Sequence, residues 1–172
     1  MKQLLLLVTI SVYCQITNAQ KSIQWISFEE AIILNKQKPK PILIDIYTDW
    51  CGYCKKMDLN SYTNKTIANY INQNYYAVKL NGEQKKDIIY NNKTYTFKKD
   101  GRRGYHELAA TLMEGKLAYP TTIFLSKEEK VIDIIPGYIE KKAVEKMLTY
   151  YANETYKTTS WRKFGKNFKS NL

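Results

Sequence analysis

Residues 42–55 read ILIDIYTDWCGYCK, and this stretch decides the fold. Its first part, residues 42–47, is apolar apart from Asp45, which predicts a central strand buried on both faces. Cys51 and Cys54 follow at the expected strand-to-helix turn, where two cysteines separated by two residues can close a small disulfide. A helix N-terminus stabilises a thiolate, so the leading hypothesis is thiol–disulfide exchange.

The N-terminal residues predict a cleaved secretory signal. Lys2 precedes an apolar stretch over residues 4–13, and small residues follow, which is the three-part pattern of such signals. The apolar stretch is too short to span a bilayer. We therefore expect residues 1–19 to be removed and the protein to be periplasmic or otherwise exported. Cys14 leaves with this signal, and the bulky Tyr13 before it disfavours a lipid anchor there.

The cysteine count favours a redox pair over a disulfide scaffold. Without the signal, the chain holds only Cys51 and Cys54, which are too few to brace an exported domain. A closed zinc site takes four ligands, and these cysteines together with His106 do not supply them. We expect His106 to lie at the surface of its helix, and we expect no metal and no cofactor besides the cysteine pair. Covalent haem attachment is excluded because Lys55 follows Cys54, where that motif has histidine.

The formal charge of +11 is compatible with anionic partners. Most lysines are dispersed, however, and only residues 98–103 (KKDGRR) form a dense basic run. We interpret this run as a solvated loop and expect no nucleic-acid binding. The length suits a single domain, which we expect to be a monomer.

Strand and helix patterns alternate along the chain. A capping box at residues 27–30 opens one helix, and Asn64 caps another. The alternation predicts a right-handed parallel βαβ unit. Asn91 and Asn92 tolerate the positive φ of a tight hairpin turn. The expected strands cover residues 23–26, 42–47, 75–80, 88–90, 94–97, 121–125 and 131–135, and the expected helices cover residues 27–37, 105–113 and 140–152 and begin at 51 and 64.

Three separated features of this pattern resemble the thioredoxin family. Residues 42–55 are similar to its active-site strand and turn, residues 119–121 (YPT) to its cis-proline loop, and Gly137 to a glycine that the family has there. The similarity covers about residues 23–152. Residues 47–51 (YTDWC), which lead into the cysteine pair, resemble the periplasmic C-terminal domain of the membrane thiol:disulfide interchange protein and exported bacterial thioredoxin-like proteins. It implies an α/β, thioredoxin-like fold, in which helices flank a central mixed β-sheet.

The resemblance implies roles for the cysteine pair and for a buried acid. Cys51 corresponds to the nucleophile, the more exposed of the two, with a pKa near about 7. Cys54 corresponds to the resolving cysteine that attacks Cys51 in the mixed disulfide. Asp45 matches the family's buried acid, which takes the proton from Cys54, and burial is expected to raise its pKa. The alternative for Asp45 is a strand acid that points outward or only bonds backbone.

The same resemblance implies a substrate-binding surface around the dithiol. Tyr119–Pro120 corresponds to a cis peptide bond that leaves the Tyr119 backbone free to pair with an extended client segment. Trp50, Gly52 and Tyr53 complete this surface, with core packing as the alternative for Trp50. The implied partners are protein thiols and disulfides. A reductase outside the cytosol also needs an electron donor, for which our hypothesis is a membrane thiol carrier.

Two departures from the family pattern leave questions open. Tyr53 stands where thioredoxin has proline, so the motif does not assign the direction of electron flow; we favour a reductase over an oxidase or isomerase. The segment before Pro120 is longer than in minimal thioredoxins, and this insertion either recognises a partner or decorates the surface. A non-catalytic binding module on the same scaffold is the alternative class of function.

These patterns divide the chain into a signal, a domain and a tail. The signal covers residues 1–19, the thioredoxin-like domain covers 20–156 with an insertion at about 82–103, and a basic, aromatic extension covers 157–172. We favour docking of the aromatic side chains of this extension on the domain over membrane contact. The segment is short, and Gly165 interrupts its helical pattern.

Overall fold

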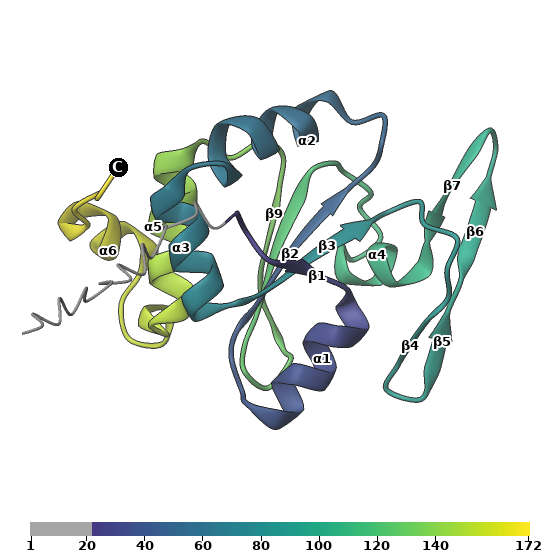
Figure 1. Cartoon of the computed structure of the whole chain (residues 1–172), viewed down its shortest axis with the longest axis horizontal. Helices are drawn as coiled ribbons and strands as arrows, with labels where there is room; N and C mark the ends of the chain where they lie inside the picture. The colour runs from purple at the N-terminus through teal and green to yellow at the C-terminus, as the bar shows by residue number, and fades with distance from the viewer. Residues whose placement is uncertain (1–21) are drawn as a thin grey trace, which may run out of the picture.

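Strand β2 lies at the centre of a five-stranded sheet with the order β1–β3–β2–β8–β9 (Figure 1). The computed structural model describes residues 22–172, so the predicted signal and Cys14 lie outside the described part of the chain. The elements are, in chain order, β1 (Trp25–Ile26), α1 (Phe28–Gln37), β2 (Ile42–Tyr47), α2 (Gly52–Met57), the π-helical turn η1 (Asp58–Tyr62), α3 (Lys65–Asn74), β3 (Tyr76–Asn81), β4 (Ile88–Tyr90), β5 (Lys93–Tyr95), β6 (Phe97–Asp100), β7 (Arg103–His106), α4 (Glu107–Leu112), β8 (Thr121–Leu125), β9 (Val131–Pro136), α5 (Lys141–Ala152), the 3₁₀ turn η2 (Thr155–Lys157) and α6 (Trp161–Asn167).

The sheet is mixed, as predicted. β1, β3 and β2 are parallel neighbours, and β8 and β9 continue the sheet in antiparallel pairing. In this register Asp45 lies between Lys79 on β3 and Thr122 on β8. Directly opposite residues of neighbouring strands share a face of the sheet, so these three side chains point to the same side.

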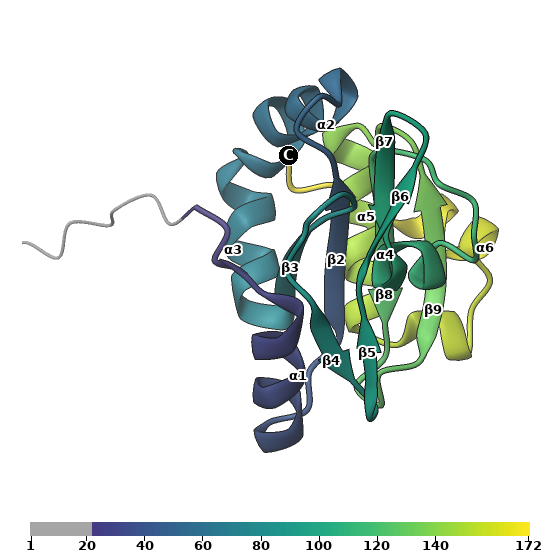
Figure 2. The same cartoon turned by 90° about the vertical axis from the view of Figure 1, so that its right-hand side faces the viewer.

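Helices cover both faces of the sheet (Figures 1 and 2). Side chains of β2 alternate between the two faces, which explains why nearly the whole strand is buried. Ile44 and Ile46 face α1 and α4, whereas Leu43 faces α2, α3 and α5. Each fully buried side chain of this kind contributes about 1.5–3 kcal/mol to stability. Asp45 is two residues after Leu43 and therefore projects into the α2 side.

The predicted helix starts are confirmed by their caps. The Ser27 hydroxyl accepts a hydrogen bond from the Glu30 N–H at 3.1 Å, which begins α1. The Asn64 side chain accepts hydrogen bonds from the N–H groups of Thr66 and Ile67, which begins α3. These caps satisfy backbone donors that the first turn of a helix leaves unpaired.

The insertion consists of two hairpins that extend beyond α4, along the right-hand side of Figure 1. The predicted hairpin β4–β5 is present, and Asn91 and Asn92 have the expected positive φ values of 51° and 61°. The interpretation of residues 98–103 as a loop was wrong, because residues 98–100 and Arg103 belong to the second hairpin, β6–β7. Charged side chains obscured this strand pairing in the sequence, since they project into solvent while their backbone is paired.

Gly104 allows the second hairpin to close. A side chain at this position would collide with the Phe97 ring and the Lys98 carbonyl oxygen across the strand pair. The base of the hairpin is tied to α4, because the Glu107 carboxylate accepts hydrogen bonds from the N–H and the hydroxyl of Thr96 at 2.8 and 3.0 Å. The hairpin is therefore fixed to the domain at its base.

His106 is buried, so its prediction as a surface residue was wrong. The spacing predicts a helix from Tyr105, but the helix begins two residues later, and Tyr105 and His106 end β7 instead. The His106 N–H donates to the Gly82 carbonyl at 2.7 Å, and its Nδ1 accepts from the Leu108 N–H at 3.3 Å, which caps α4. Burial lowers the pKa of the imidazole, and the negative charges of Asp87 and Glu107 partly oppose this lowering.

Acid is expected to destabilise the domain through this histidine. In the unfolded chain His106 binds a proton near pH 6.5, whereas in the folded chain it binds one only at lower pH. The contribution of the neutral His106 to stability is therefore complete above pH 6.5 and is lost as pH falls. The slope is at most about 1.4 kcal/mol per pH unit. His106→Asn keeps a capping acceptor without this titration. Between pH 7.5 and pH 5.5, the melting temperature should therefore fall further for the wild type than for this variant. An equal fall in both proteins would contradict the assignment of this acid sensitivity to His106.

The C-terminal extension packs on α5. The rings of Trp161 and Phe164 lie 5.2 and 5.0 Å from the ring of Tyr150, which is the docking that we favoured. The buried Glu145 carboxylate accepts a hydrogen bond from the Asn171 N–H at 2.7 Å and another from the Ser170 hydroxyl. No helix within residues 22–172 has the length and apolar character needed to cross a bilayer.

Candidate functional site

Cys51 and Cys54 form a disulfide at the turn from β2 into α2. Cys51 is the N-cap of α2, and its Sγ accepts a hydrogen bond from the Cys54 N–H at 3.0 Å. The exposed fractions of the two residues are 4% and 2%, so Cys51 is the more exposed only by a small margin. The pair predicted from the sequence is therefore together, and it is well covered in this oxidised form.

The side chains next to the disulfide are exposed. Trp50 and Tyr53 flank Cys51, and 50% and 64% of their surfaces are accessible. Gly52 is also exposed, and no atom lies within 4 Å of the position that a Cβ would take there. Core packing, the alternative for Trp50, is wrong because of this exposure. The Trp50 ring lies perpendicular to the Tyr119 ring, with the ring centroids 5.9 Å apart.

The Tyr119–Pro120 loop lies beside this surface. Its peptide bond is cis, and Pro120 is buried. The Tyr119 ring packs over Gly82, where a Cβ would come within 2.5 Å of the ring and its hydroxyl. Among residues 22–172, no group donates to the Tyr119 C=O or accepts from the Tyr119 N–H. The loop therefore presents an unpaired piece of backbone near the disulfide.

Asp45 is buried on the side of the sheet that α2 covers. It is 1% exposed, and its Oδ2 accepts from Lys79 Nζ at 2.5 Å. Burial raises the pKa of Asp45, and the neighbouring Lys79 ammonium partly opposes this rise. Oδ1 has no hydrogen-bond partner among the described residues. The outward-facing strand acid, the alternative for Asp45, is excluded by this burial.

Lys79 joins Asp45 to a second carboxylate, Asp58, at the start of η1. The Asp45 and Asp58 charges raise the Lys79 pKa by more than burial lowers it, so Lys79 stays protonated. The side-chain exposure increases from Asp45 (2%) through Lys79 (18%) to Asp58 (42%). Cys54 and Asp58 are four residues apart on continuous helical turns and share a face, so Asp58 connects the cysteine helix to the buried acid.

Two polar groups complete the surroundings of Asp45. The hydroxyl groups of Tyr62 and Thr122 are buried without a hydrogen-bond partner in the part of the chain that the structure describes. Burial, together with the Asp45 charge, raises the pKa of Tyr62 well above its ordinary value. Sequence reasoning missed these groups and Lys79. Only Lys79 had a visible signal, as the single charged residue in the strand expected at residues 75–80, whose other residues are apolar or aromatic.

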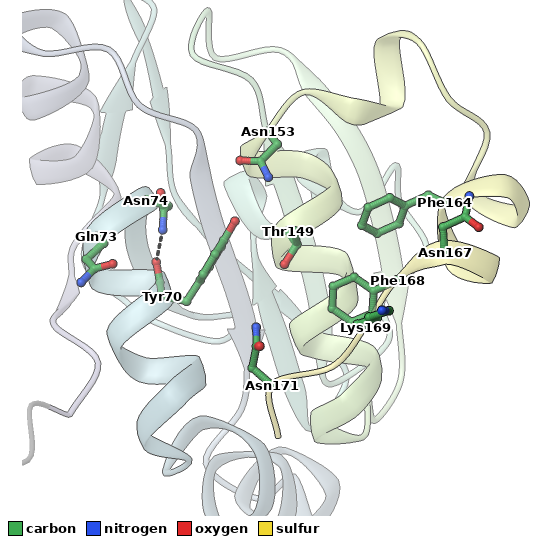
Figure 3. Close-up of a pocket in the computed structure, with 10 residues that line it drawn as sticks. All are labelled: Tyr70, Gln73, Asn74, Thr149, Asn153, Phe164, Asn167, Phe168, Lys169 and Asn171. Carbon is green, nitrogen blue, oxygen red and sulfur yellow. Dashed lines mark hydrogen bonds between the residues drawn. The ribbon is translucent and has the colours of Figure 1, made fainter.

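A separate cavity of about 620 Å³ lies between α3, α5 and the C-terminal extension (Figure 3). Tyr70, Phe164 and Phe168 contribute rings to its wall, and the other lining residues are mostly amides. None of the predicted site residues lines it. Within residues 22–172, no three histidine, cysteine or acidic side chains are grouped to hold a metal ion.

Comparisons with known proteins agree with this architecture. A family model described as "Protein of unknown function, DUF255" (Thioredox_DsbH) matches residues 5–170. An uncharacterized protein of Caenorhabditis elegans is 29% identical over 72 residues, which cover 41% of this chain and 10% of that protein. The chain spans about a tenth of the length of the curated relatives it matches.

Solved structures show the same fold. A thioredoxin-fold protein from Helicobacter pylori is similar with a TM-score of 0.56 and 18% identity, over 74% of this chain and 79% of that chain. A structure described as DsbH oxidoreductase is similar with a TM-score of 0.52 and 19% identity, over 78% of this chain and 86% of that chain. The fold is thioredoxin-like, as the sequence resemblance implied.

Proposed function

The chain belongs to the family whose model, Thioredox_DsbH, matches residues 5–170, and on this premise we propose that it is a thiol–disulfide oxidoreductase that reduces protein disulfides. The observation that carries the proposal is the Cys51–Cys54 disulfide at the β2–α2 turn of a thioredoxin-like fold. The similar solved structure described as DsbH oxidoreductase supports this proposal. No metal or separate cofactor takes part, because the cysteine pair itself carries the two electrons.

The first step breaks the client disulfide. In the reduced protein, the Cys51 thiolate attacks one client sulfur, which forms a mixed disulfide and releases the other client sulfur as a thiolate. That thiolate takes a proton from water. The Cys54 N–H, which donates to Cys51 Sγ in the oxidised form, is a group suited to stabilise the Cys51 anion.

The second step releases the client. The Cys54 thiol transfers its proton to the Asp45 carboxylate, and the resulting thiolate attacks Cys51 Sγ. The mixed disulfide breaks, the second client sulfur leaves as a thiolate that takes a proton from water, and the Cys51–Cys54 disulfide forms. Two electrons have passed from the protein to the client, so a dithiol donor must return the protein to its reduced form. We propose a membrane thiol carrier as that donor.

The client is held as an extended segment. The Tyr119 N–H and C=O are unpaired within the described residues, which supports strand-like pairing with the client backbone. The exposed Trp50 and Tyr53 rings offer apolar contact on either side of Cys51. Because residues 1–19 have the pattern of a secretory signal, we propose that this exchange takes place after export.

The reductase direction is tested by the reduction potential of the Cys51–Cys54 pair. A reductant is expected to have a value near that of thioredoxin, about −270 mV, whereas a strong oxidant lies near about −120 mV. Equilibration with glutathione or dithiothreitol buffers, followed by alkylation of free thiols, measures it. A value near the oxidant's would reverse the proposed direction of electron flow.

The activity itself is tested by insulin precipitation with dithiothreitol. The wild type is expected to shorten the lag before turbidity, because it relays electrons to the insulin disulfides faster than the small thiol does. The matched control carries both Cys51→Ser and Cys54→Ser, which removes the dithiol and keeps the size of the side chains. If the wild type is no faster than this control, the protein is a binding module rather than an oxidoreductase.

A further inference from the structure

Arg103 at the start of β7 stacks on Trp50, the residue directly before Cys51. Its guanidinium carbon lies 3.8 Å from the centroid of the Trp50 ring. The same ring packs perpendicular to the Tyr119 ring, so Arg103, Trp50 and Tyr119 lie side by side next to the disulfide. The insertion hairpin thus brings a cation to the surface that we assign to client binding.

The position of Arg103 is fixed from two sides. The β6–β7 pairing and the anchored base of the hairpin hold its backbone, and stacking holds the plane of its guanidinium group. A cation–π contact at an exposed site contributes about 0.5–1 kcal/mol. This contact orders the side chain while leaving its N–H donors open to a ligand. A rigid, planar fork of donors matches a carboxylate in bidentate geometry.

No carboxylate of the described residues is paired with this guanidinium group. The salt bridges within residues 22–172 involve lysines only, and the Lys98 ammonium of the same hairpin pairs with Glu107 at 3.4 Å. Arg103 borders an open hollow of about 490 Å³. Asp49, the acid of that hollow that directly precedes Trp50 in the sequence, accepts a hydrogen bond from the Asn81 amide at 3.2 Å instead.

The hollow carries more positive than negative charge. Its charged lining consists of Asp49, Glu83, Lys85, Arg102 and Arg103. Arg102 and Arg103 are exposed, and neither forms a salt bridge within the described residues. A client side chain that enters this hollow therefore meets unpaired arginine donors beside the disulfide.

We propose that Arg103 is a specificity residue that binds an aspartate or glutamate next to the reacting cysteine of the client. This inference rests on the proposed oxidoreductase function and names its preferred substrate class, acidic client segments. Since Arg103 contacts the residue directly before Cys51, the client carboxylate belongs within about three residues of its cysteine, which is on the order of 10 Å of extended chain.

The test compares disulfide-linked peptides that differ at one position. Each carries Asp, Asn or Lys two residues from its cysteine, and stopped-flow fluorescence measures the rate at which the reduced, full-length protein cleaves it. The wild type is expected to cleave the Asp peptide about tenfold faster than the Asn peptide, since hydrogen bonds to charged groups have about this effect. The Lys peptide is expected to be slowest.

Arg103→Gln is expected to reduce the Asp-to-Asn ratio to near one, and Arg103→Lys is expected to retain part of it. The ratio separates recognition from thiolate chemistry, because both peptides react with the same Cys51 thiolate. Lys36→Ala is the control variant, because it also removes one positive charge. Lys36 is exposed in the last turn of α1, which lies at the end of the sheet where β2 begins and not at the end that carries the disulfide. It should keep the wild-type ratio.

The outcomes distinguish the two proposals. If the wild type cleaves all peptides at similar rates, or Arg103→Gln keeps the preference, the specificity role of Arg103 is overturned while the oxidoreductase function stands. If the wild type cleaves none of them, both are overturned. Binding of an uncleavable Asp peptide, with serine in place of its cysteine, gives an independent readout, and Arg103→Gln should weaken it by a similar factor.

Discussion

The Cys54→Ser variant is expected to stop at the mixed disulfide and to lose turnover by several orders of magnitude. The first step needs only the Cys51 thiolate, whereas release of the client needs a second sulfur nucleophile within reach of Cys51. We propose Cys54 as that nucleophile, since its Cα lies 5.3 Å from the Cα of Cys51. A serine hydroxyl does not break a disulfide under these conditions. Mass spectrometry of the reduced variant after mixing with a peptide disulfide measures the trapped adduct.

The matched control for this trap is Cys51→Ser. It is expected to form no adduct, because Cys54 is the more buried of the two cysteines and Cys51 is the proposed attacking thiol. Both variants lack the same disulfide, so any general effect of its loss on stability is shared between them. Adduct formation at Cys54 in the Cys51→Ser variant, at the rate seen with Cys51, would exchange the two assigned roles.

The Asp45→Asn variant is expected to slow release of the client by about 10²–10⁴-fold and to leave client capture nearly unchanged. General acid–base groups contribute a factor of this size to proton transfers. Asparagine keeps the shape and a hydrogen-bonding oxygen for Lys79, but it does not accept the Cys54 proton. Rapid mixing with a fluorescent peptide disulfide, followed by acid quenching, separates capture from release.

Asp58→Asn is the matched control, because Asp58 is the other carboxylate on the same lysine and is substantially exposed. Its loss is expected to have a much smaller effect on release. Equal slowing of capture and release in the Asp45 variant would remove the proton-transfer role. A comparable effect of the Asp58 variant would assign the slowing to the lysine contact rather than to the buried acid.

The pH dependence gives a second signature of Asp45. Burial, partly opposed by the Lys79 charge, raises its pKa in the folded protein, so release should speed up as pH rises through this raised value and the carboxylate forms. The folded chain then binds a proton that the unfolded chain has already lost. This favours folding at low pH, and the contribution disappears as pH rises through the folded pKa. The Asp45→Asn variant should show neither this pH dependence of client release nor this pH dependence of stability. The contribution of His106 to stability has the opposite sign, because it is lost as pH falls.

Most elements were visible in the sequence, and the exceptions have physical causes. The strand at residues 42–47 matched its prediction because a buried central strand is a continuous apolar run. The β6–β7 hairpin was missed because pairing of exposed strands needs no apolar pattern, only a compatible turn and Gly104. His106 was misplaced because the same spacing fits a helix face and the end of a strand.

The sequence by itself determined the thioredoxin-like order of strands and helices and the position of the Cys51–Cys54 pair, because both depend on residues that are neighbours along the chain. Only the tertiary structure decided which side chains meet. The sheet register joins Asp45 to Lys79, and a returning hairpin sets Arg103 on Trp50. Such contacts link residues tens of positions apart, and local periodicity carries no information about pairing over that separation.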